Sequence, residues 1–341
     1  MLRSLEYEEV LKENKKPMVF VDVRSPKEFK EATIPGAVNI PLFTDEEREE
    51  IGTIYVKDSQ DKAKKRGIEI VSKKLPQMYE SYKAIDDEKK KIAIFCARGG
   101  MRSSSIASLL TALGMDIVKV TKGYKGYREY INHSLPRLFE EIKFVVLYGN
   151  TGTGKTHLLS KLREMGYDTL DLEASANHRG SLLGSVGLGS GNSQKMFESL
   201  VFQELSKRKT NLVFTEGESK RIDKIVMPEY MFNAIQNGTQ INVTAPLEYR
   251  IKNIKDDYLI NESSKYEIIE ALKNMNKYIS SSRIEKFTGK ILKDEYDEVI
   301  SELMITYYDP MYNFKDRNFY CEVSNTNLEE CCITILDKVK K

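Results

Sequence analysis

Two stretches of the sequence have the residue types and spacing of reactive loops, and the first is a phosphate-binding pattern. Residues 149–156 read GNTGTGKT, which fits G-x-x-x-x-G-K-[ST] in full between an apolar run and a helical one. Its glycines let the backbone N–H groups point into one concavity, and the following helix adds its positive end. The pattern predicts binding of a phosphate, diphosphate or nucleotide. The expected binding residues are Gly149, Asn150, Thr151, Gly152, Thr153, Gly154, Lys155 and Thr156.

Side chains in and near this loop indicate its charge chemistry. Lys155 brings a positive charge to the phosphates, and the hydroxyl of Thr156 is a candidate ligand of Mg²⁺. An acid at the end of a later strand is expected to assist, and NLVFTEGES offers Glu216 or Glu218. Aspartate is commoner than glutamate in this role, and a solvated turn explains an acidic strand end equally well.

The second reactive stretch is CARGGMRSS, residues 96–104, which follows the apolar run KIAIF and precedes a helical pattern. Backbone N–H groups, a helix N-terminus and the charges of Arg98 and Arg102 would surround the thiol of Cys96. Such surroundings lower a thiol pKa and stabilise an anion on sulfur, whereas a buried core cysteine is the alternative interpretation. The other members of this anion-binding loop are Ala97, Gly99, Gly100 and Met101.

Elsewhere the sequence offers little for metal or disulfide chemistry. The cysteines at positions 321, 331 and 332 lack such neighbours and are interpreted as core or surface thiols. The chain has three histidines and no C-x-x-C pair, so a zinc site is not predicted.

Alternating apolar and helical patterns indicate the elements that position both loops. Short strands are expected at 17–24 and 91–95 in the first part, and at 143–149, 168–173, 211–216 and 241–246 in the second. Strands that alternate with helices predict a parallel α/β sheet in each half. We expect a first domain at 1–134, a linker at 135–142, and a P-loop domain at 143–341 that is mostly helical beyond about 247.

Composition describes an ordinary globular chain. Of its 341 residues 40% are hydrophobic and 30% charged, and the formal net charge is +2. No apolar run approaches the ~20 residues of a membrane span, and the acidic start is unlike a signal peptide, so we expect no membrane association and a cytoplasmic location. Residues 57–74 carry 7 basic and 3 acidic side chains, and 272–293 carry 6 and 1. Such basic runs are explained either by solvent-exposed helix faces or by a surface that binds a polyanion.

The first domain resembles the rhodanese family. The resemblance is carried by VDVRSPKEF with Asp22 and Arg24, by IPGAVNIP, and by FCARGGMRS with Cys96 as the nucleophile. Five residues separate Cys96 from Arg102, one more than in the short sulfur-carrying loop of that family and as many as in dual-specificity phosphatases. A longer loop makes a wider cradle, which suits a tetrahedral oxyanion such as phosphate, thiophosphate or selenophosphate.

Over roughly 1–335 the chain resembles the tRNA 2-selenouridine synthase family, in which a rhodanese-like domain precedes a P-loop domain. Its most specific segments are EEREEIGTIY (46–55) and LEASANHRGS (172–181). The resemblance implies replacement of sulfur by selenium at a wobble 2-thiouridine, through S-geranylation from geranyl diphosphate and then displacement by selenium from selenophosphate. No tightly bound cofactor is implied. An enzyme that supplies selenophosphate is an expected partner, besides the tRNA anticodon arm.

The resemblance also suggests roles for the two loops. The P-loop would bind the diphosphate of the prenyl donor, and Cys96 would hold selenium while Arg98 and Arg102 neutralise the departing phosphate. Contacts to tRNA or phosphate are expected from His178 and Arg179 in the loop NHRG, for which a capped surface turn is the alternative. The lysines and arginine of KKR, Lys64, Lys65 and Arg66, are further candidates. The sequence beyond about 247 matches loosely, so no site is assigned there.

Three other functions fit parts of the chain. A phosphatase or arsenate reductase built on the Cys96 loop leaves the P-loop without a role. A P-loop kinase or nucleotide switch with a rhodanese-like binding module leaves the cysteine without one. A plain thiosulfate sulfurtransferase explains only half of the chain.

Overall fold

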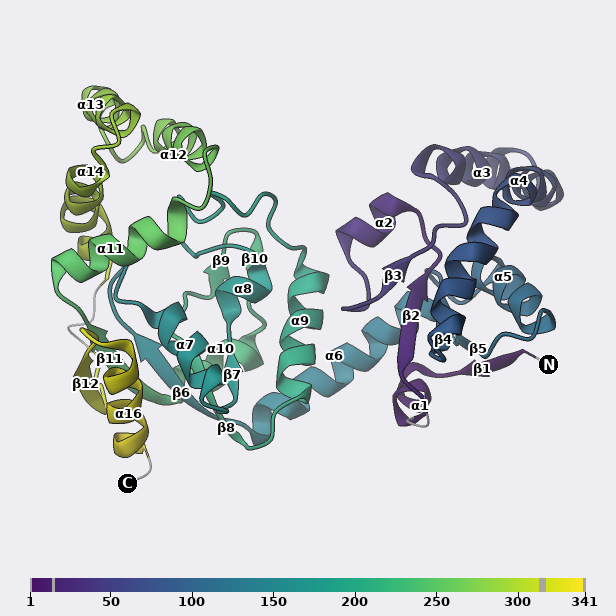
Figure 1. Ribbon diagram of the computed structural model, residues 1–341, viewed down its shortest axis with the longest axis horizontal. Helices are drawn as coiled ribbons and strands as arrows, with labels where there is room; N and C mark the ends of the chain where they lie inside the picture. The colour runs from purple at the N-terminus through teal and green to yellow at the C-terminus, as the bar shows by residue number, and fades with distance from the viewer. Residues whose placement is uncertain (1, 14–15, 313–316, 340–341) are drawn as a thin grey trace. The chain divides into compact units, whose positions relative to one another are not determined.

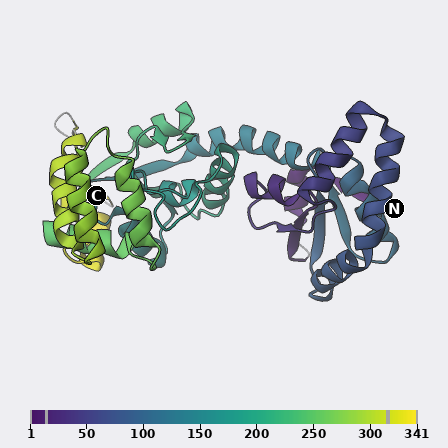
Figure 2. The same ribbon diagram turned by 90° about the horizontal axis from the view of Figure 1, so that it is seen from above.

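The computed structural model describes residues 2–13, 16–312 and 317–339, and the chain divides into two compact units (Figure 1). The first unit is Met1–Ser134 and the second is Leu135–Lys341. Each contains a five-stranded sheet in which the strands pair in parallel. Figures 1 and 2 show helices on both faces of each sheet. The two expected α/β sheets are therefore confirmed.

The sheet of the first unit has the strand order β1-β5-β4-β2-β3. Its strands are β1 (Arg3–Leu5), β2 (Met18–Asp22), β3 (Val38–Asn39), β4 (Lys91–Phe95) and β5 (Ile117–Val120). Its helices are α1 (Tyr7–Lys12), α2 (Pro26–Glu31), α3 (Asp45–Lys57), α4 (Gln60–Asp87), α5 (Met101–Ala112) and α6 (Gly123–Glu141). All of β4 is buried, as a continuous apolar run predicts for a strand covered on both faces.

Helix starts in this unit follow from capping residues. The side chain of Ser25 accepts a hydrogen bond from the amide of Glu28, and the carboxylate of Glu28 accepts one from the amide of Ser25. Pro26 occupies the first helical turn of α2. Thr44 caps α3 in the same way. The charged stretch after IPGAVNIP forms the two helices α3 and α4, which pack against each other.

The sheet of the second unit has the order β12-β11-β6-β8-β7. Its strands are β6 (Lys143–Tyr148), β7 (Thr169–Leu170), β8 (Leu212–Glu216), β11 (Thr239–Thr244) and β12 (Cys321–Ser324), and β9 (Arg221–Ile222) and β10 (Ile225–Val226) form a separate antiparallel pair. Its helices are α7 (Lys155–Glu164), α8 (Leu172–Ala176), α9 (Gln194–Ser206), α10 (Glu229–Gln236), α11 (Leu247–Tyr258), α12 (Ser264–Lys273), α13 (Ser281–Leu292), α14 (Tyr296–Leu303), the π-helix η1 (Met304–Tyr308), α15 (Asp309–Met311) and α16 (Leu328–Val339).

One strand expected from the sequence is shorter in the structure, and two features of the fold were not expected. The strand expected at 168–173 is only two residues long, because Asp171 caps helix α8 and the helix begins at Leu172. The expected linker 135–142 is helical up to Glu141, since α6 continues through it. The strand β1 near the start of the chain was not expected, and it pairs with β5 at the sheet edge.

The region after 247 has its own core. Apolar residues of α11 to α14 and η1 form one buried cluster, in which Leu272 and Phe287 are almost fully enclosed. In the described part of the chain, no helix is long and apolar enough to cross a membrane.

Candidate functional site

The thiol of Cys96 lies in a loop that favours its ionised form. Its Sγ is 3.2 Å from the hydroxyl oxygen of Ser103, and the side chain is buried. Burial alone raises the pKa of Cys96, but hydrogen bonds from the Ser103 hydroxyl, from the amides of Ser103 and Arg98, and the charge of Arg102 outweigh it. The net effect is a lowered pKa, as a nucleophilic cysteine requires.

Glycines let the Cys96 loop lie directly against the start of α6. The amide of Tyr124 donates to the carbonyl oxygen of Cys96 at 2.8 Å, and the amide of Lys125 to that of Ala97 at 3.0 Å. Gly123 has a φ of +55°, and a Cβ there would lie 2.1 Å from the carbonyl oxygen of Cys96. The close approach that supports the reactive loop therefore needs glycine at 123.

The two loop arginines have different surroundings. Arg98 is exposed, whereas Arg102 is partly buried and its Nη1 lies 2.7 Å from Oε2 of Glu28. Burial raises the pKa of Glu28, but the hydrogen bond and charge of Arg102, together with the Ser25 amide and the charge of Arg24, lower it by more. Arg102 is therefore held at the rim of the loop by a carboxylate.

Other residues of the rhodanese resemblance have a structural role. Asp22 and Arg24 form a buried ion pair of 2.6 Å, and the guanidinium of Arg24 lies 4.3 Å from the ring centre of Tyr124. Tyr124 and Tyr127 are both buried, so they pack in the interior and are not available to stack on a base.

The expected phosphate loop joins β6 to α7 in the second unit. Gly149, Gly152 and Gly154 all have positive φ angles, and a Cβ on Gly149 would lie 2.3 Å from the carbonyl oxygen of Val243. The ammonium of Lys155 donates to the carbonyl of Gly149 at 2.8 Å. A phosphate in the concavity would exchange this carbonyl contact for a stronger one to an anion.

The outer side of this loop is held by residues from the region after 247. Arg250 Nε donates to the carbonyl of Thr151 at 2.9 Å, and Nδ2 of Asn253 to that of Gly152 at 2.9 Å. Asn325, which follows β12, donates to the carbonyl of Thr153 at 2.8 Å. The region after 247, to which the sequence analysis assigned no site, therefore supports the backbone of the loop. Strand β12 pairs with β11, and the tail thereby returns to the loop.

Four carboxyl groups gather beside the start of α7, from Asp171, Glu173, Glu216 and Glu218. Glu216 ends strand β8, is buried, and accepts from the amide of Glu173 at 2.9 Å. Burial first, then the neighbouring carboxylates, raise the pKa of Glu216 and also that of Glu173, the latter to about 8. The cluster therefore holds protons at neutral pH unless a cation offsets its charge.

This cluster fits a divalent cation bound together with phosphate oxygens. The hydroxyl of Thr156 is 3.4 Å from Oε2 of Glu173, and Oε2 of Glu216 is buried with no hydrogen-bond partner. Hydroxyl and carboxylate oxygens suit Mg²⁺, which takes one or two carboxylates and completes its shell with substrate phosphates and water. Among the described residues, no group of three or more His, Cys, Asp or Glu side chains holds a metal by itself.

The segment 172–181 lies against the same carboxyl groups. Gly180 has a φ of +64°, and a Cβ there would lie 2.9 Å from Oε2 of Glu218. The ring of His178 is buried, and burial lowers its pKa, so the ring is neutral. Arg179 donates to the carbonyl of Val186 at 2.7 Å. Contact with tRNA through His178 and Arg179 stays a prediction, and their packing favours support of this segment.

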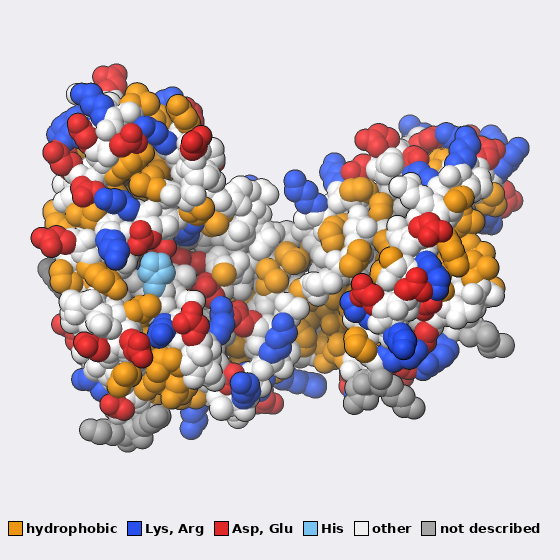
Figure 3. All heavy atoms as spheres, viewed as in Figure 1, with side chains coloured by type: hydrophobic (Ala, Val, Ile, Leu, Met, Phe, Trp, Pro, Cys, Tyr) orange, Lys and Arg blue, Asp and Glu red, His pale blue; other side chains and the backbone are white. Residues whose placement is uncertain are grey.

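The basic residues of α4 are only partly available to a polyanion. Lys64 and Lys65 are exposed, and Lys64 lies 3.0 Å from Asp61. Arg66 pairs with Glu50 at 2.6 Å and is less exposed. Acidic and basic side chains alternate on the face shown in Figure 3. Binding of tRNA through this stretch remains a prediction.

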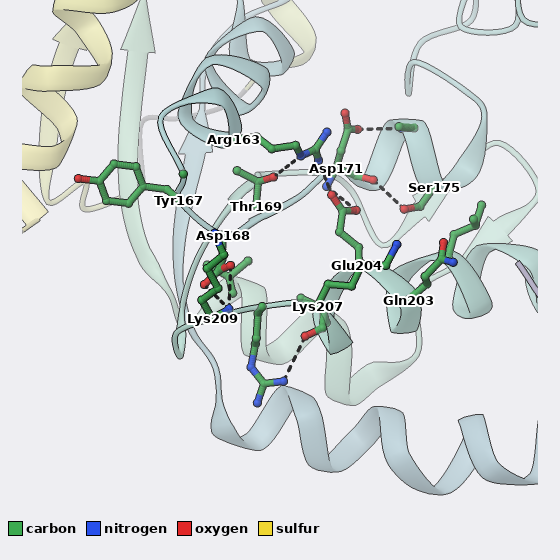
Figure 4. A pocket seen from close by; sticks show the side chains of 16 residues that line it. Arg163, Tyr167, Asp168, Thr169, Asp171, Ser175, Gln203, Glu204, Lys207 and Lys209 are labelled. Atoms are coloured by element: carbon green, nitrogen blue, oxygen red, sulfur yellow. Dashed lines mark hydrogen bonds and ion pairs between the residues drawn. The ribbon is translucent and has the colours of Figure 1, made fainter. Parts of the chain in front are cut away.

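A separate hollow of about 510 Å³ lies against the edge strand β7, and its lining includes several charged side chains. Figure 4 shows Arg163 between Thr169 and Glu204, and its guanidinium donates a hydrogen bond to each of them. Asp168 accepts from the amide of Lys209 at 3.0 Å. Arg163 pairs with Glu204, and Asp168 is held by a backbone amide, so these groups already have partners within the protein and we assign no ligand to this hollow.

Several residues of both sites were missed by the sequence interpretation. They are Glu28 and Ser103 at the Cys96 loop, and Asp171, Glu173, Arg250, Asn253 and Asn325 around the P-loop. Ser103 had a local signal, because it follows Arg102 in the first turn of a helix that begins at the loop. Asp171 and Glu173 lie in or next to the segment LEASANHRGS, but nothing local showed that they face the phosphate loop. Glu28, Arg250, Asn253 and Asn325 had no local signal, since their partners are distant in sequence.

Comparisons with known proteins identify a matching family for each half of the chain. Residues 142–340 match the family model of the tRNA 2-selenouridine synthase AAA domain, and residues 6–130 match that of the rhodanese-like domain. A tRNA 2-selenouridine synthase of Hydrogenovibrio crunogenus is 30% identical, with 94% of each chain covered. The one of Nitrosomonas europaea is 31% identical, over 81% of this chain and 73% of its own.

Solved structures match single parts of the chain. The N-terminal domain of a putative ATP/GTP binding protein from Clostridium difficile 630 is 38% identical, covers 38% of this chain and 98% of its own, and gives a TM-score of 0.36.

Proposed function

Because this chain belongs to the tRNA 2-selenouridine synthase family, it is an enzyme that replaces sulfur by selenium in tRNA, and we propose that it does so in two steps. The first is geranylation of the 2-thiouridine sulfur from geranyl diphosphate, and the second is displacement of the thioether by selenium from selenophosphate. The observation that carries this proposal is the presence in one chain of a complete phosphate loop and a cysteine with a lowered pKa. A phosphatase, a nucleotide switch or a plain sulfurtransferase would use only one of them.

The phosphate loop is assigned to the geranyl step. The sulfur of 2-thiouridine attacks C1 of the geranyl group, the C1–oxygen bond breaks, and diphosphate leaves, while the proton on N3 of the base passes to the diphosphate or to water. Lys155, the loop amides and the N-terminus of α7 stabilise the charge that develops on the departing diphosphate. Thr156, Glu216 and Glu173 would hold Mg²⁺, which adds further positive charge at the same oxygens when bound.

The cysteine loop is assigned to the selenium step. The amides and arginines around Cys96 suit a tetrahedral anion, and the lowered pKa makes the thiolate available. A selenosulfide formed on Cys96 directly from selenophosphate would leave phosphorus as phosphite, since the transferred selenium would be two electrons more oxidised. If phosphate is the product, the thiolate attacks phosphorus, and the phosphorus–selenium bond breaks to release hydrogen selenide. Water then cleaves the sulfur–phosphorus bond of phosphorylated Cys96, which releases phosphate and restores the thiol. Labelling the selenophosphate at phosphorus or at selenium distinguishes the two, because each route leaves a different label on Cys96.

Geranylation gives the second step a better leaving group. The C2–selenium bond forms, the C2–sulfur bond breaks, and geranyl thiolate leaves, while the hydrogen of hydrogen selenide ends on N3 of the base. A thiocarbonyl would have to release sulfide, which is a poorer leaving group than a thiolate.

Mass spectrometry of nucleosides from thiolated tRNA tests both steps. The purified chain is incubated with geranyl diphosphate, with and without selenophosphate, beside Cys96→Ala and Lys155→Ala. We expect geranylated thiouridine without selenophosphate and selenouridine with it. Cys96→Ala should stop at the geranylated nucleoside, and Lys155→Ala should form little of it. Unchanged thiouridine from the unmutated chain in every reaction would refute the proposal.

A further inference from the structure

The first unit carries an apolar groove that the functions assigned so far do not use. It has a volume of about 870 Å³ and is bounded by α3, α4 and the start of α5, which lie in neighbouring positions in Figure 1. Several large apolar side chains in it are exposed: Val56 by 82%, Ile68 by 69%, Met101 by 57% and Tyr55 by 44%. Apolar patches of this kind mark binding sites in soluble proteins more often than they serve the fold.

The exposed side chains lie outside the core of the unit. Helix α4 already buries Ile70, Met78 and Tyr82 in the core of the unit, whereas the exposed Val56 of α3 and Ile68 of α4 line the groove. A solvated helix face would carry polar residues at these positions. One side of the groove is formed by the segment EEREEIGTIY, which is also among the most specific parts of the family resemblance. The functions assigned to the two reactive loops give this segment no role.

The groove is continuous with the cysteine loop. Met101 belongs to the cysteine loop, and the next residue is Arg102, which forms an ion pair with Glu28 at the rim of that loop. Both residues line the groove together with Ser104 and Ser105 of α5. An apolar group attached to a base that is bound at Cys96 can therefore extend from the loop into the groove without crossing the core.

The selenium step requires such a place. If the proposed function holds, the reacting C2 carries a ten-carbon apolar chain through its sulfur atom, and this chain must lie within a few bonds of the cysteine loop. The groove falls within the ~300–1,000 Å³ of small-molecule pockets and is lined predominantly by apolar side chains. By contrast, the apolar cavity beside Thr151 in the second unit has a volume of about 60 Å³.

We propose that the groove between α3, α4 and α5 binds the geranyl chain of S-geranyl-2-thiouridine during the selenium step. This inference rests on the proposed function. It assigns Val56, Ile68 and Met101 to recognition of the intermediate. Contact with another protein, or with another part of this chain, is the competing use of the same surface.

The test compares two thioethers that differ only in the chain. Thiolated tRNA is alkylated chemically with a geranyl or a methyl group, and the rate of selenouridine formation from selenophosphate is measured for each. The leaving groups are both alkyl thiolates, so a rate advantage of the geranyl substrate reports binding of its chain. The variants are Val56→Glu and Ile68→Glu, with Val56→Ser and Ile68→Ser as milder changes. Both side chains are largely exposed, so folding is expected to be preserved.

We expect the unmutated chain to prefer the geranyl substrate, and the charged variants to lower the geranyl-to-methyl ratio at least about tenfold. The control Leu113→Glu places the same charge on an exposed apolar position of the same unit outside the groove, and its ratio should stay unchanged. An unchanged ratio in the groove variants, or equal loss with both substrates, overturns the inference. An unmutated chain that converts both thioethers equally well also overturns the inference and leaves the two-step function intact. If the unmutated chain converts neither the geranyl nor the methyl thioether, the proposed function itself is refuted.

Discussion

Removing the hydroxyl of Ser103 should make Cys96 a weaker nucleophile. The hydroxyl oxygen lies 3.2 Å from Sγ of Cys96 and also 3.2 Å from the carbonyl oxygen of Gly100. With the neutral thiol, the hydroxyl can donate to Gly100. With the thiolate, it has to donate to sulfur, which accepts only. Ser103→Ala removes this donor and leaves the amides of Ser103 and Arg98 in place, so the pKa of Cys96 rises.

The size of the effect follows from the strength of one charge-assisted hydrogen bond. Such a bond contributes about 1.5–3 kcal/mol, and about 1.4 kcal/mol corresponds to a factor of ten. At a pH below the pKa of the variant, its thiolate fraction and therefore its alkylation rate should fall roughly tenfold to hundredfold.

The assay is alkylation of Cys96 by iodoacetamide as a function of pH, followed by mass spectrometry of the peptide that contains it. Burial raises the pKa of the other thiols, to about 12 for Cys331 and about 11 for Cys332, so they compete little at neutral pH. The matched control is Ser105→Ala, since this exposed hydroxyl on the same helix donates to the carbonyl of Arg102. If Ser103→Ala keeps the profile of the unmutated chain, or Ser105→Ala shifts it equally, the assigned role of Ser103 is wrong.

Three further predictions concern the two loops. Lys155→Ala should lower geranylation at least about a hundredfold while selenouridine still forms from tRNA that is already geranylated, and equal loss in both reactions would contradict the division of labour. Gly123→Ala should destabilise the first unit by about 1–3 kcal/mol in urea unfolding and slow alkylation of Cys96, because the new Cβ would meet the carbonyl of Cys96. The control is Gly114→Ala, because Gly114 also has a positive φ but a Cβ there would contact nothing, so its loss of unfolding free energy should be smaller. Because the pKa of Glu173 is raised to about 8, the folded state holds a proton that the unfolded state loses near pH 4.5, so without Mg²⁺ the free energy of unfolding should fall between about pH 5 and about pH 8. Glu173→Gln should flatten that fall in urea unfolding, and an unchanged slope would show that the group does not titrate as described.

Much of the architecture could be predicted because its signals are local. The apolar runs before Cys96 and Gly149 form β4 and β6, and the helices that follow begin directly after the loops, at Met101 and Lys155. Of the two acids considered at the end of the strand in NLVFTEGES, Glu216 or Glu218, Glu216 is the last residue of β8, which pairs with β6 just before the phosphate loop. By contrast, the burial of His178 could not be read from the sequence, because a His-Arg pair among small residues is equally compatible with an exposed loop.

The amino-acid sequence by itself determined the two reactive loops and the alternation of strands and helices around them, because the contacts that make a phosphate loop or a cysteine loop join residues only a few positions apart. Tertiary structure alone decided what surrounds these loops. Asn325 reaches Thr153, 172 residues earlier, only because β12 pairs with β11 and β11 with β6. Glu173 meets Thr156 because the carboxyl ends of parallel strands share one edge of the sheet. Strand order is a property of the packed chain, since each strand is selected as a neighbour by the burial it offers to the others.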